Sequence, residues 1–97
     1  ERVNQLLEVV EENLTEGLSG AAEKIISEAI DSFTYSKENY AKLISVLSYT
    51  YETQGRYAEA LKGIEEYESE ENLKDLSSET KLSVLTRLAS SHSNTAD

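Results

Sequence analysis

The chain has 97 residues, a hydrophobic content of 38% and a formal net charge of −10 at pH 7. This length predicts one domain over residues 1–97, and the negative charge argues against nucleic-acid binding because it repels phosphate backbones. No stretch approaches the roughly 20 apolar residues of a membrane span, and the absence of cysteine excludes disulfides and thiolate metal sites. We expect a cytoplasmic, intracellular domain and, since methionine is absent even at position 1, a piece of a longer protein.

Apolar residues recur at three- and four-residue steps through most of the chain, which is the period of a helix packed by one face. The pattern predicts an all-α fold with no strand. In chain order, the expected helices cover residues 2–16, 19–33, 37–54, 57–71 and 78–93. The first four pair as two hairpins, 2–33 and 37–71, and the helix over 78–93 has no partner in the sequence.

Glycine and serine mark the ends of these helices. Gly17 and Gly55 each follow a predicted helix, and glycine readily adopts the left-handed conformation that ends one. Hydroxyl side chains that can accept hydrogen bonds from the first turn precede three of the helices: Ser19, Ser36 and either Ser77 or Ser78.

The segment between the fourth and fifth helices, Glu68 to Ser78, is polar except for two leucines. We expect Leu73 and Leu76 to hold it against the rest of the chain. The prediction is a helical extension or a short turn, not a disordered linker.

The best-defined hairpin surrounds Gly55, and its spacing resembles that of a tetratricopeptide repeat. That family places a large residue, Leu, a small residue and Tyr on the first helix, then Gly-x-Tyr, then Ala and spaced apolar residues on the second. The corresponding residues here are Ile44, Leu47, Ser48, Tyr51, Gly55, Tyr57, Ala60, Ile64 and Tyr67. Two positions depart from the family: Ser48 stands where Gly or Ala is commonest, and Tyr67 replaces a small Ala, so its ring is expected to push the following helix outwards.

Weaker copies of the same pattern occur on both sides of this hairpin, and a repeat needs neighbours because it cannot bury its apolar face alone. A shift of 38 residues towards the N-terminus reaches Leu6, Val9, Val10, Asn13, Gly17, Ser19, Ala22, Ile26 and Ala29. A shift of 41 residues the other way reaches Leu85, Leu88, Ala89 and His92. The resemblance therefore implies antiparallel helix-turn-helix repeats stacked as a right-handed α-solenoid of about five helices.

In the family that the chain resembles, the first helices of the repeats line a concave groove that holds a peptide or a partner helix. The groove-facing positions correspond to Lys42, Ser45, Tyr49, Glu52 and Thr53 in the middle repeat and to Thr86, Ser90 and Asn94 in the last helix. Some members grip a C-terminal carboxylate with Lys and Asn at two of these places. Ser45 and Tyr49 stand there in this chain, and Leu7 and Glu11 in the first repeat, so that mode is not supported.

Tyr49 has two interpretations. It is the tyrosine most free to face outwards into the groove, or its ring is partly buried as an edge packed on the first hairpin.

Two functions remain open on this basis. The first is a protein-interaction scaffold whose groove binds a protein or peptide. The second is a regulatory or sensor module that binds a small ligand or docks on an effector domain of the same chain. Among Glu8, Glu11, Glu12 and Glu16, a binding site for a basic partner competes with the favoured interpretation of a solvated helix face.

Catalytic chemistry has few candidates. His92 is the only histidine, so two imidazoles cannot share a metal ion, and we expect no acid beside its ring. The acidic run from Glu65 to Glu71 lacks the glycine bend of a calcium loop, which favours a solvated helix end. We expect no enzyme activity, no catalytic residue, no metal and no cofactor.

The last predicted helix carries an apolar side formed by Leu82, Leu85, Leu88 and Ala89. Part of this side is expected to pack on the helix over 57–71, and the rest to stay open. Exposed apolar stripes tend to become covered, so the sequence predicts self-association or pairing with a neighbouring molecule through residues 82–92.

Overall fold

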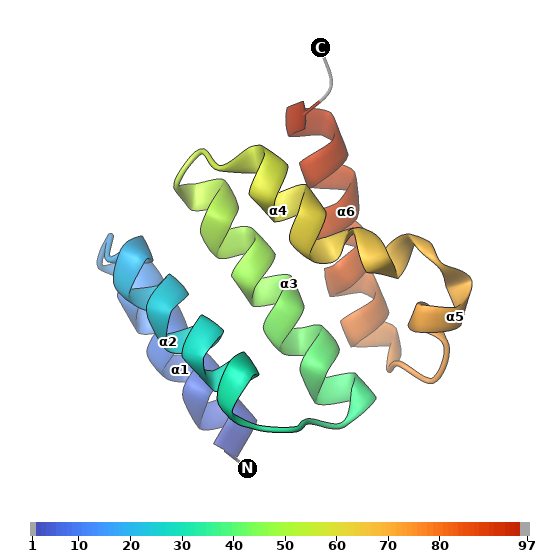
Figure 1. Ribbon diagram of the computed structural model, residues 1–97, viewed down its shortest axis with the longest axis horizontal. Coiled ribbons are helices and arrows are strands. Elements are labelled where there is room, and N and C mark those ends of the chain that lie inside the picture. The colour runs from blue at the N-terminus through green and yellow to red at the C-terminus, as the bar shows by residue number, and fades with distance from the viewer. Residues whose placement is uncertain (1, 96–97) are drawn as a thin grey trace.

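The computed structural model describes residues 2–95, which fold into helices joined by short turns (Figure 1). The elements are α1 (Arg2–Thr15), α2 (Ser19–Ser32), α3 (Lys37–Thr53), α4 (Tyr57–Ile64), the 3₁₀ turn η1 (Glu65–Glu68), α5 (Glu70–Leu73) and α6 (Ser78–Thr95). No strand occurs over this range, which confirms the predicted all-α class. None of the helices between residues 2 and 95 has the length and apolarity needed to cross a membrane.

Helix α3 lies at the centre of the molecule (Figure 1). It packs against α2 and α1 on one side and against α4 and α6 on the other. Helices α1 and α2 form one hairpin, and α3 and α4 form the second, while α6 packs on both helices of the second hairpin. The predicted pairing of the helices over 37–54 and 57–71 is therefore confirmed for α3 and α4.

Two apolar cores lie on opposite sides of α3. The first is centred on α1 and α2, and Leu43 is the buried residue that α3 contributes to it. The second lies between α3, α4 and α6, and α3 contributes Ala41 and Ile44. Because Leu43 and Ile44 are neighbours in sequence, they point in directions about 100° apart on the helix. One helix thus forms a wall of both cores.

The two hairpin turns share the same backbone hydrogen bonds. Gly17 and Gly55 both adopt positive φ, +81° and +74°. In the second turn, the Arg56 amide donates to the Tyr51 carbonyl at 3.0 Å and the Gly55 amide donates to the Glu52 carbonyl at 3.0 Å. The same pair of bonds recurs 38 residues earlier in the chain. This arrangement satisfies the free carbonyls at a helix end, as predicted for both glycines.

Two of the three predicted serine caps are confirmed. The Ser36 hydroxyl accepts from the Asn39 amide at 3.2 Å and caps α3, and the Ser77 hydroxyl accepts from the Thr80 amide at 3.2 Å and caps α6. The prediction for Ser19 is wrong, because Leu18 precedes α2 and no side chain caps it. The turn at Gly17 passes into α2 after one residue, so Ser19 is already helical.

The continuous helix predicted over 57–71 is also wrong. Helix α4 ends at Ile64, continues as η1 and breaks at Ser69, whose backbone is extended. Carboxylates crowd this segment, and negative charge is unfavourable at the C-terminal end of a helix dipole. The charges of Glu70 and Glu71 instead fall in the first turn of α5, where the helix dipole favours them. The predicted helical turn between Glu68 and Ser78 is confirmed as α5.

Tyr67 occupies η1 and does not push α6 away. A 3₁₀ turn eclipses residues three apart, which places Tyr67 over Ile64 on the same face. Both side chains are buried in the second core, and α6 packs against α4 and η1 alike. Burial raises the pKa of the Tyr67 phenol well above its ordinary value. Leu76 is buried in the same core and Leu73 packs against it, as predicted.

Helix α6 buries one face and exposes another. Thr80, Val84, Leu88 and Ser91 are buried, whereas Leu82, Leu85 and Ala89 are exposed. Leu88 therefore packs towards α4, as predicted. Leu82 and Leu85 form the part of the apolar side that was expected to stay open. Val84 is a core residue that the predicted apolar side did not include.

Helices α3 and α4 approach closely at Ser48 and Ala60. Ala60 is fully buried, and the Ser48 hydroxyl donates to its carbonyl oxygen at 2.9 Å. Ser48 stands where the repeat family most often has Gly or Ala, and its hydroxyl has a hydrogen-bond partner on α4.

Because Ala60 is fully buried where α3 and α4 meet, Ala60→Leu is expected to overpack this contact and to lower the free energy of unfolding by roughly 1–3 kcal/mol. Chemical denaturation followed by circular dichroism measures the change. The exposed neighbour Ala58→Leu is the matched control and should stay within about 0.5 kcal/mol of the parent. Equal stability of the two variants would show that α3 and α4 do not meet at Ala60.

Glu38 links the N-terminal ends of α3 and α6. Its carboxylate accepts hydrogen bonds from the Thr80 hydroxyl, from the Ser77 amide at 2.8 Å and from the Ser77 hydroxyl at 2.8 Å. The Thr80 hydroxyl and then the Ser77 amide hold the pKa of Glu38 below its ordinary value of 4.5. The charged carboxylate is thus the form that the fold stabilises.

The lowered pKa predicts how stability varies with pH. The contribution of Glu38 is present above the unfolded-state pKa of about 4.5 and is lost as pH falls through the lower folded-state value. Glu38→Gln should therefore be less stable than the parent at pH 7, and the difference should shrink below about pH 4. Thermal unfolding of both proteins from pH 7 to pH 3 measures it. A difference that stays constant over this range would mean that the charge of Glu38 contributes nothing.

Candidate functional site

The strongest candidate site is a groove on the face where α1, α3 and α6 meet. Its main part is a cavity of about 520 Å³ that side chains of all three helices line. Helix α1 contributes Glu11, Leu14 and Thr15, α3 contributes Ser45, Val46, Tyr49 and Thr53, and α6 contributes Ser83 and Arg87. We call this the α1–α3–α6 groove.

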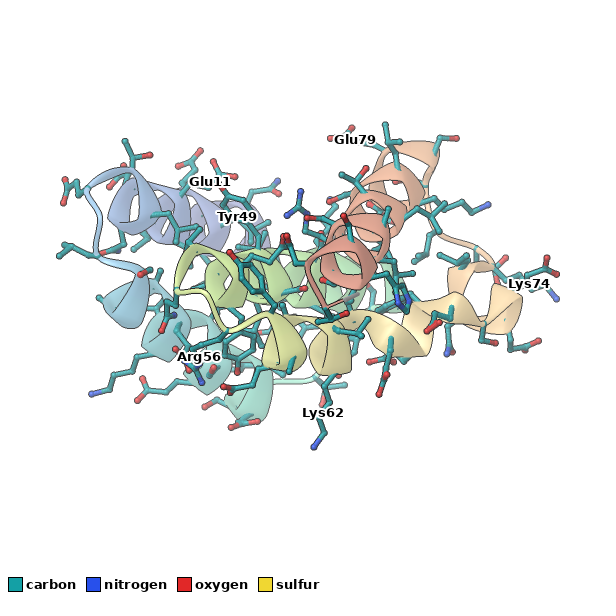
Figure 2. All side chains as sticks on the ribbon, turned by 90° about the horizontal axis from the view of Figure 1, so that it is seen from above. Glu11, Tyr49, Arg56, Lys62, Lys74 and Glu79 are labelled. Carbon is teal, nitrogen blue, oxygen red and sulfur yellow. The ribbon has the colours of Figure 1, made fainter. Side chains whose placement is uncertain are left out.

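A second cavity, of about 240 Å³, extends the groove along the same helices. It shares Glu11, Val46 and Ser83 with the first. The remaining lining residues are Asn4, Leu7, Lys42, Glu79 and Thr80. Figure 2 shows α1 and α6 standing on either side of α3, with Glu11, Tyr49 and Glu79 pointing to this face and Arg56 and Lys62 pointing away from it.

Tyr49 is the aromatic residue of the groove, and Arg87 holds its ring. Tyr49 is 44% exposed, and the Arg87 guanidinium lies over its ring at 5.0 Å from the centroid. Arg87 in turn donates from Nη1 to the Glu52 carboxylate at 2.7 Å. The structure thus favours the outward-facing interpretation of Tyr49, whose ring contacts Arg87 of α6.

Glu52 holds Arg87 in its position over Tyr49. Its side chain is 9% exposed and accepts from Arg87 and, at 2.6 Å, from the Ser90 hydroxyl. A buried carboxylate needs such partners because charge is costly to remove from water. Glu52 therefore fixes Arg87 beside Tyr49 and joins α3 to α6.

The groove floor is closed by a contact between two small hydroxyl residues. Ser45 of α3 and Ser83 of α6 share a hydrogen bond of 2.8 Å between their hydroxyl oxygens. Ser45 is itself buried. The apolar part of the floor comes from Val46 and Leu14, which are both half-buried.

The predicted groove residues divide into two groups. Ser45, Tyr49 and Thr53 line the main cavity and Lys42 lines the adjoining one. Glu52, Thr86 and Ser90 line neither cavity. Glu52 and Ser90 hydrogen-bond to each other, and Thr86 is exposed on α6 outside the groove. Asn94 lies at 3.5 Å from Glu52 Oε1, at the far end of the same cluster.

Of the α1 residues that line the groove, only Leu7 and Glu11 were placed at groove positions from the sequence, although the signal for the others was present. A shift of 38 residues takes the predicted α3 positions onto α1, as Asn4, Leu7, Glu11, Leu14 and Thr15. All five line one of the two cavities. The repeat spacing alone could therefore have found this wall.

The repeat spacing predicts the α6 side of the groove only in part. Helices α1 and α6 flank α3 from opposite sides, so they turn different edges towards it. The 41-residue shift takes Ser45 and Tyr49 onto Thr86 and Ser90, which line neither cavity, but it takes Lys42 onto Ser83, which lines both. Arg87 lines the main cavity and corresponds to Val46, which was not among the predicted groove residues.

The α1 side and the α6 side of the groove differ in charge. The positive charge of Arg87 is matched by Glu52, and Lys42 faces two carboxylates, Glu11 and Glu79, across the smaller cavity. Glu8, Glu12 and Glu16 extend the acidic edge along the outer side of α1. The α1 side of the groove is therefore negative.

A larger cavity, of about 620 Å³, lies between α1, α2, the loop before α3 and the first turn of α3. Polar groups there already serve the fold, because the Ser36 hydroxyl caps α3 and the Tyr35 hydroxyl donates to the Ala29 carbonyl at 2.9 Å. The α1–α3–α6 groove differs in that charged side chains, Glu11 and Arg87, are among those that line it.

His92 has an acidic neighbour that the sequence did not predict. Its Nε2 lies 3.3 Å from Glu68 Oε1, and both side chains are about half exposed. The pair joins α6 to η1 at the surface and has no nucleophile beside it in the contacts described. Among residues 2–95, no group of three or more potential ligands is placed to hold a metal ion.

No protein-family model, curated protein or solved structure matches this chain. The resemblance to tetratricopeptide repeats therefore depends on the residues and their spacing alone.

Proposed function

We propose that this chain is a protein-interaction module whose α1–α3–α6 groove binds a peptide or a helix of a partner protein. The observation that carries the proposal is the adjacent pair Tyr49 and Arg87 on the groove surface, backed by the buried Glu52. Tyrosine and arginine are the residue types that, with tryptophan, dominate binding energy at protein interfaces. A ring held in place before binding also loses little entropy on binding.

The finer architecture that goes with this function is a right-handed stack of helix pairs of the tetratricopeptide type. Three observations support it. The hairpin turns at Gly17 and Gly55 use the same hydrogen bonds, groove positions repeat at 38 residues, and α3 packs on the hairpin before it and on the helix after it. In such a stack the first helix of each pair lines one continuous groove.

The groove also indicates the chemistry of its partner. An apolar side chain fits against Tyr49, Val46 and Leu14, where the floor is apolar. Basic side chains of the same segment would face Glu11 and the acidic edge of α1. The expected partner segment therefore combines a large apolar residue with lysine or arginine.

Selection of peptides from a random displayed library tests this function. Selected peptides should bind the domain with micromolar affinity, and Tyr49→Ala should weaken binding at least about tenfold, as for an interface hot spot. Fluorescence polarisation with labelled peptides measures both. The matched control is Tyr57→Ala, since Tyr57 is 39% exposed but lies on α4 outside the groove; it should change affinity less than about twofold.

Two results would contradict the proposal. One is a library that yields no specific binder. The other is a set of peptides that bind the Tyr49→Ala variant as tightly as the parent, which would place the binding surface elsewhere.

A further inference from the structure

The outer face of α6 carries an apolar stripe that nothing in the described structure covers. Leu82 is 68% exposed and Leu85 is 45% exposed, and Ala89 is exposed one turn further on. Spacings of three and four residues place these side chains on one side of the helix. The opposite side of α6 is buried through Val84 and Leu88.

The stripe is formed by residues of a single helix. Val9, Leu18, Phe33, Tyr49 and Tyr57 are also exposed, but no two of them lie on the same helix. Single apolar residues on a surface are ordinary, whereas contiguous ones mark surfaces that associate.

We propose that the stripe pairs with the same stripe of a second copy of the chain, with the two α6 helices antiparallel around a two-fold axis at Leu85. A two-fold axis makes a single patch complementary to itself. With Leu85 facing Leu85, the next positions bring Leu82 of one copy against Ala89 of the other. Bulky residues then face small ones at both ends, which lets the two helices approach closely.

The charges beside the stripe select the antiparallel orientation. Lys81 lies next to Leu82 at one end, and Glu68 lies beside His92 at the other. Antiparallel pairing brings Lys81 of each copy towards Glu68 of the other, whereas parallel pairing brings Lys81 against Lys81. Exposed ion pairs contribute little affinity, so these charges set the orientation and the leucines supply the attraction.

The expected dimer is weak. From Leu82 to Ala89 the stripe is only about 10 Å long at 1.5 Å per residue. A stable interface needs about 800 Å² from each partner, and the net charge of −10 on each copy adds repulsion. We therefore expect a dissociation constant on the order of 100 μM.

Sedimentation equilibrium from about 10 μM to 1 mM, a range that brackets the expected dissociation constant, tests the pairing. The parent should shift from monomer to dimer over this range, and Leu85→Glu should remain monomeric. Val9→Glu is the matched control, because Val9 is also 45% exposed but lies on α1; it should dimerise like the parent. Circular dichroism of each variant verifies that it is folded.

Cysteine cross-linking tests the orientation, and the absence of native cysteine makes it unambiguous. Leu85→Cys should form a disulfide-linked dimer on mild oxidation. Leu82→Cys should not, because in the antiparallel dimer its two copies are separated by about 9 Å along the helix axis, beyond disulfide reach.

A parent that stays monomeric at 1 mM would overturn the proposal. So would dimerisation of Leu85→Glu equal to that of the parent. Equal cross-linking of Leu82→Cys and Leu85→Cys would overturn the antiparallel arrangement.

Discussion

The structure depends on the burial of α3 from two sides. Leu43 faces the core with α1 and α2, and Ala41 and Ile44 face the core with α4 and α6. A helix enclosed in this way leaves one edge uncovered, and on α3 that edge carries Tyr49 and Thr53. The groove is therefore a direct consequence of where the two cores lie.

Small hydroxyl residues let the neighbours approach α3 this closely. Ser45 and Ser48 are both buried, and each uses its hydroxyl between helices, with Ser83 and with the Ala60 carbonyl. The Thr50 hydroxyl donates within α3, to the Val46 carbonyl at 2.8 Å. Each buried hydroxyl of α3 thus has a partner, which avoids the cost of an unpaired polar group.

Two tyrosines of α3 are held by arginines from opposite sides of the helix. Arg87 lies over Tyr49 and pairs with Glu52. Arg56 lies over Tyr51 at 4.6 Å and pairs with Glu23 of α2 at 2.5 Å. Glu59 also binds Arg56, and its carboxylate is the main reason that the pKa of Arg56 is raised. The Arg87 contacts hold α3 against α6 on one side, and the Arg56 contacts hold it against α2 on the other.

Sequence reasoning recovered what local chemistry determines. Helix periodicity, the left-handed glycines and the caps at Ser36 and Ser77 act over a few residues, so the sequence alone reveals them. The α3 groove positions were taken from the resemblance to the repeat family; four of them line the two cavities, whereas Glu52 does not and Val46 was not named.

Apart from the cap predicted at Ser19 and the continuous helix predicted over 57–71, the errors concern contacts between distant segments. Glu38 and Thr80 are 42 residues apart, and no local pattern joins them. The edge that α6 turns to the groove depends on how the helix sits against α3. Each of these follows from packing, which the spacing of apolar residues does not determine.

Amide hydrogen exchange measures the central role of α3 most directly. A helix that walls two cores should open only with the whole domain. The amides from Ile44 to Thr50 should therefore exchange most slowly, with a common opening free energy equal to that of global unfolding. Exchange of these amides as fast as those of α5, or a lower protection than in α1 and α6, would contradict a structure organised around α3.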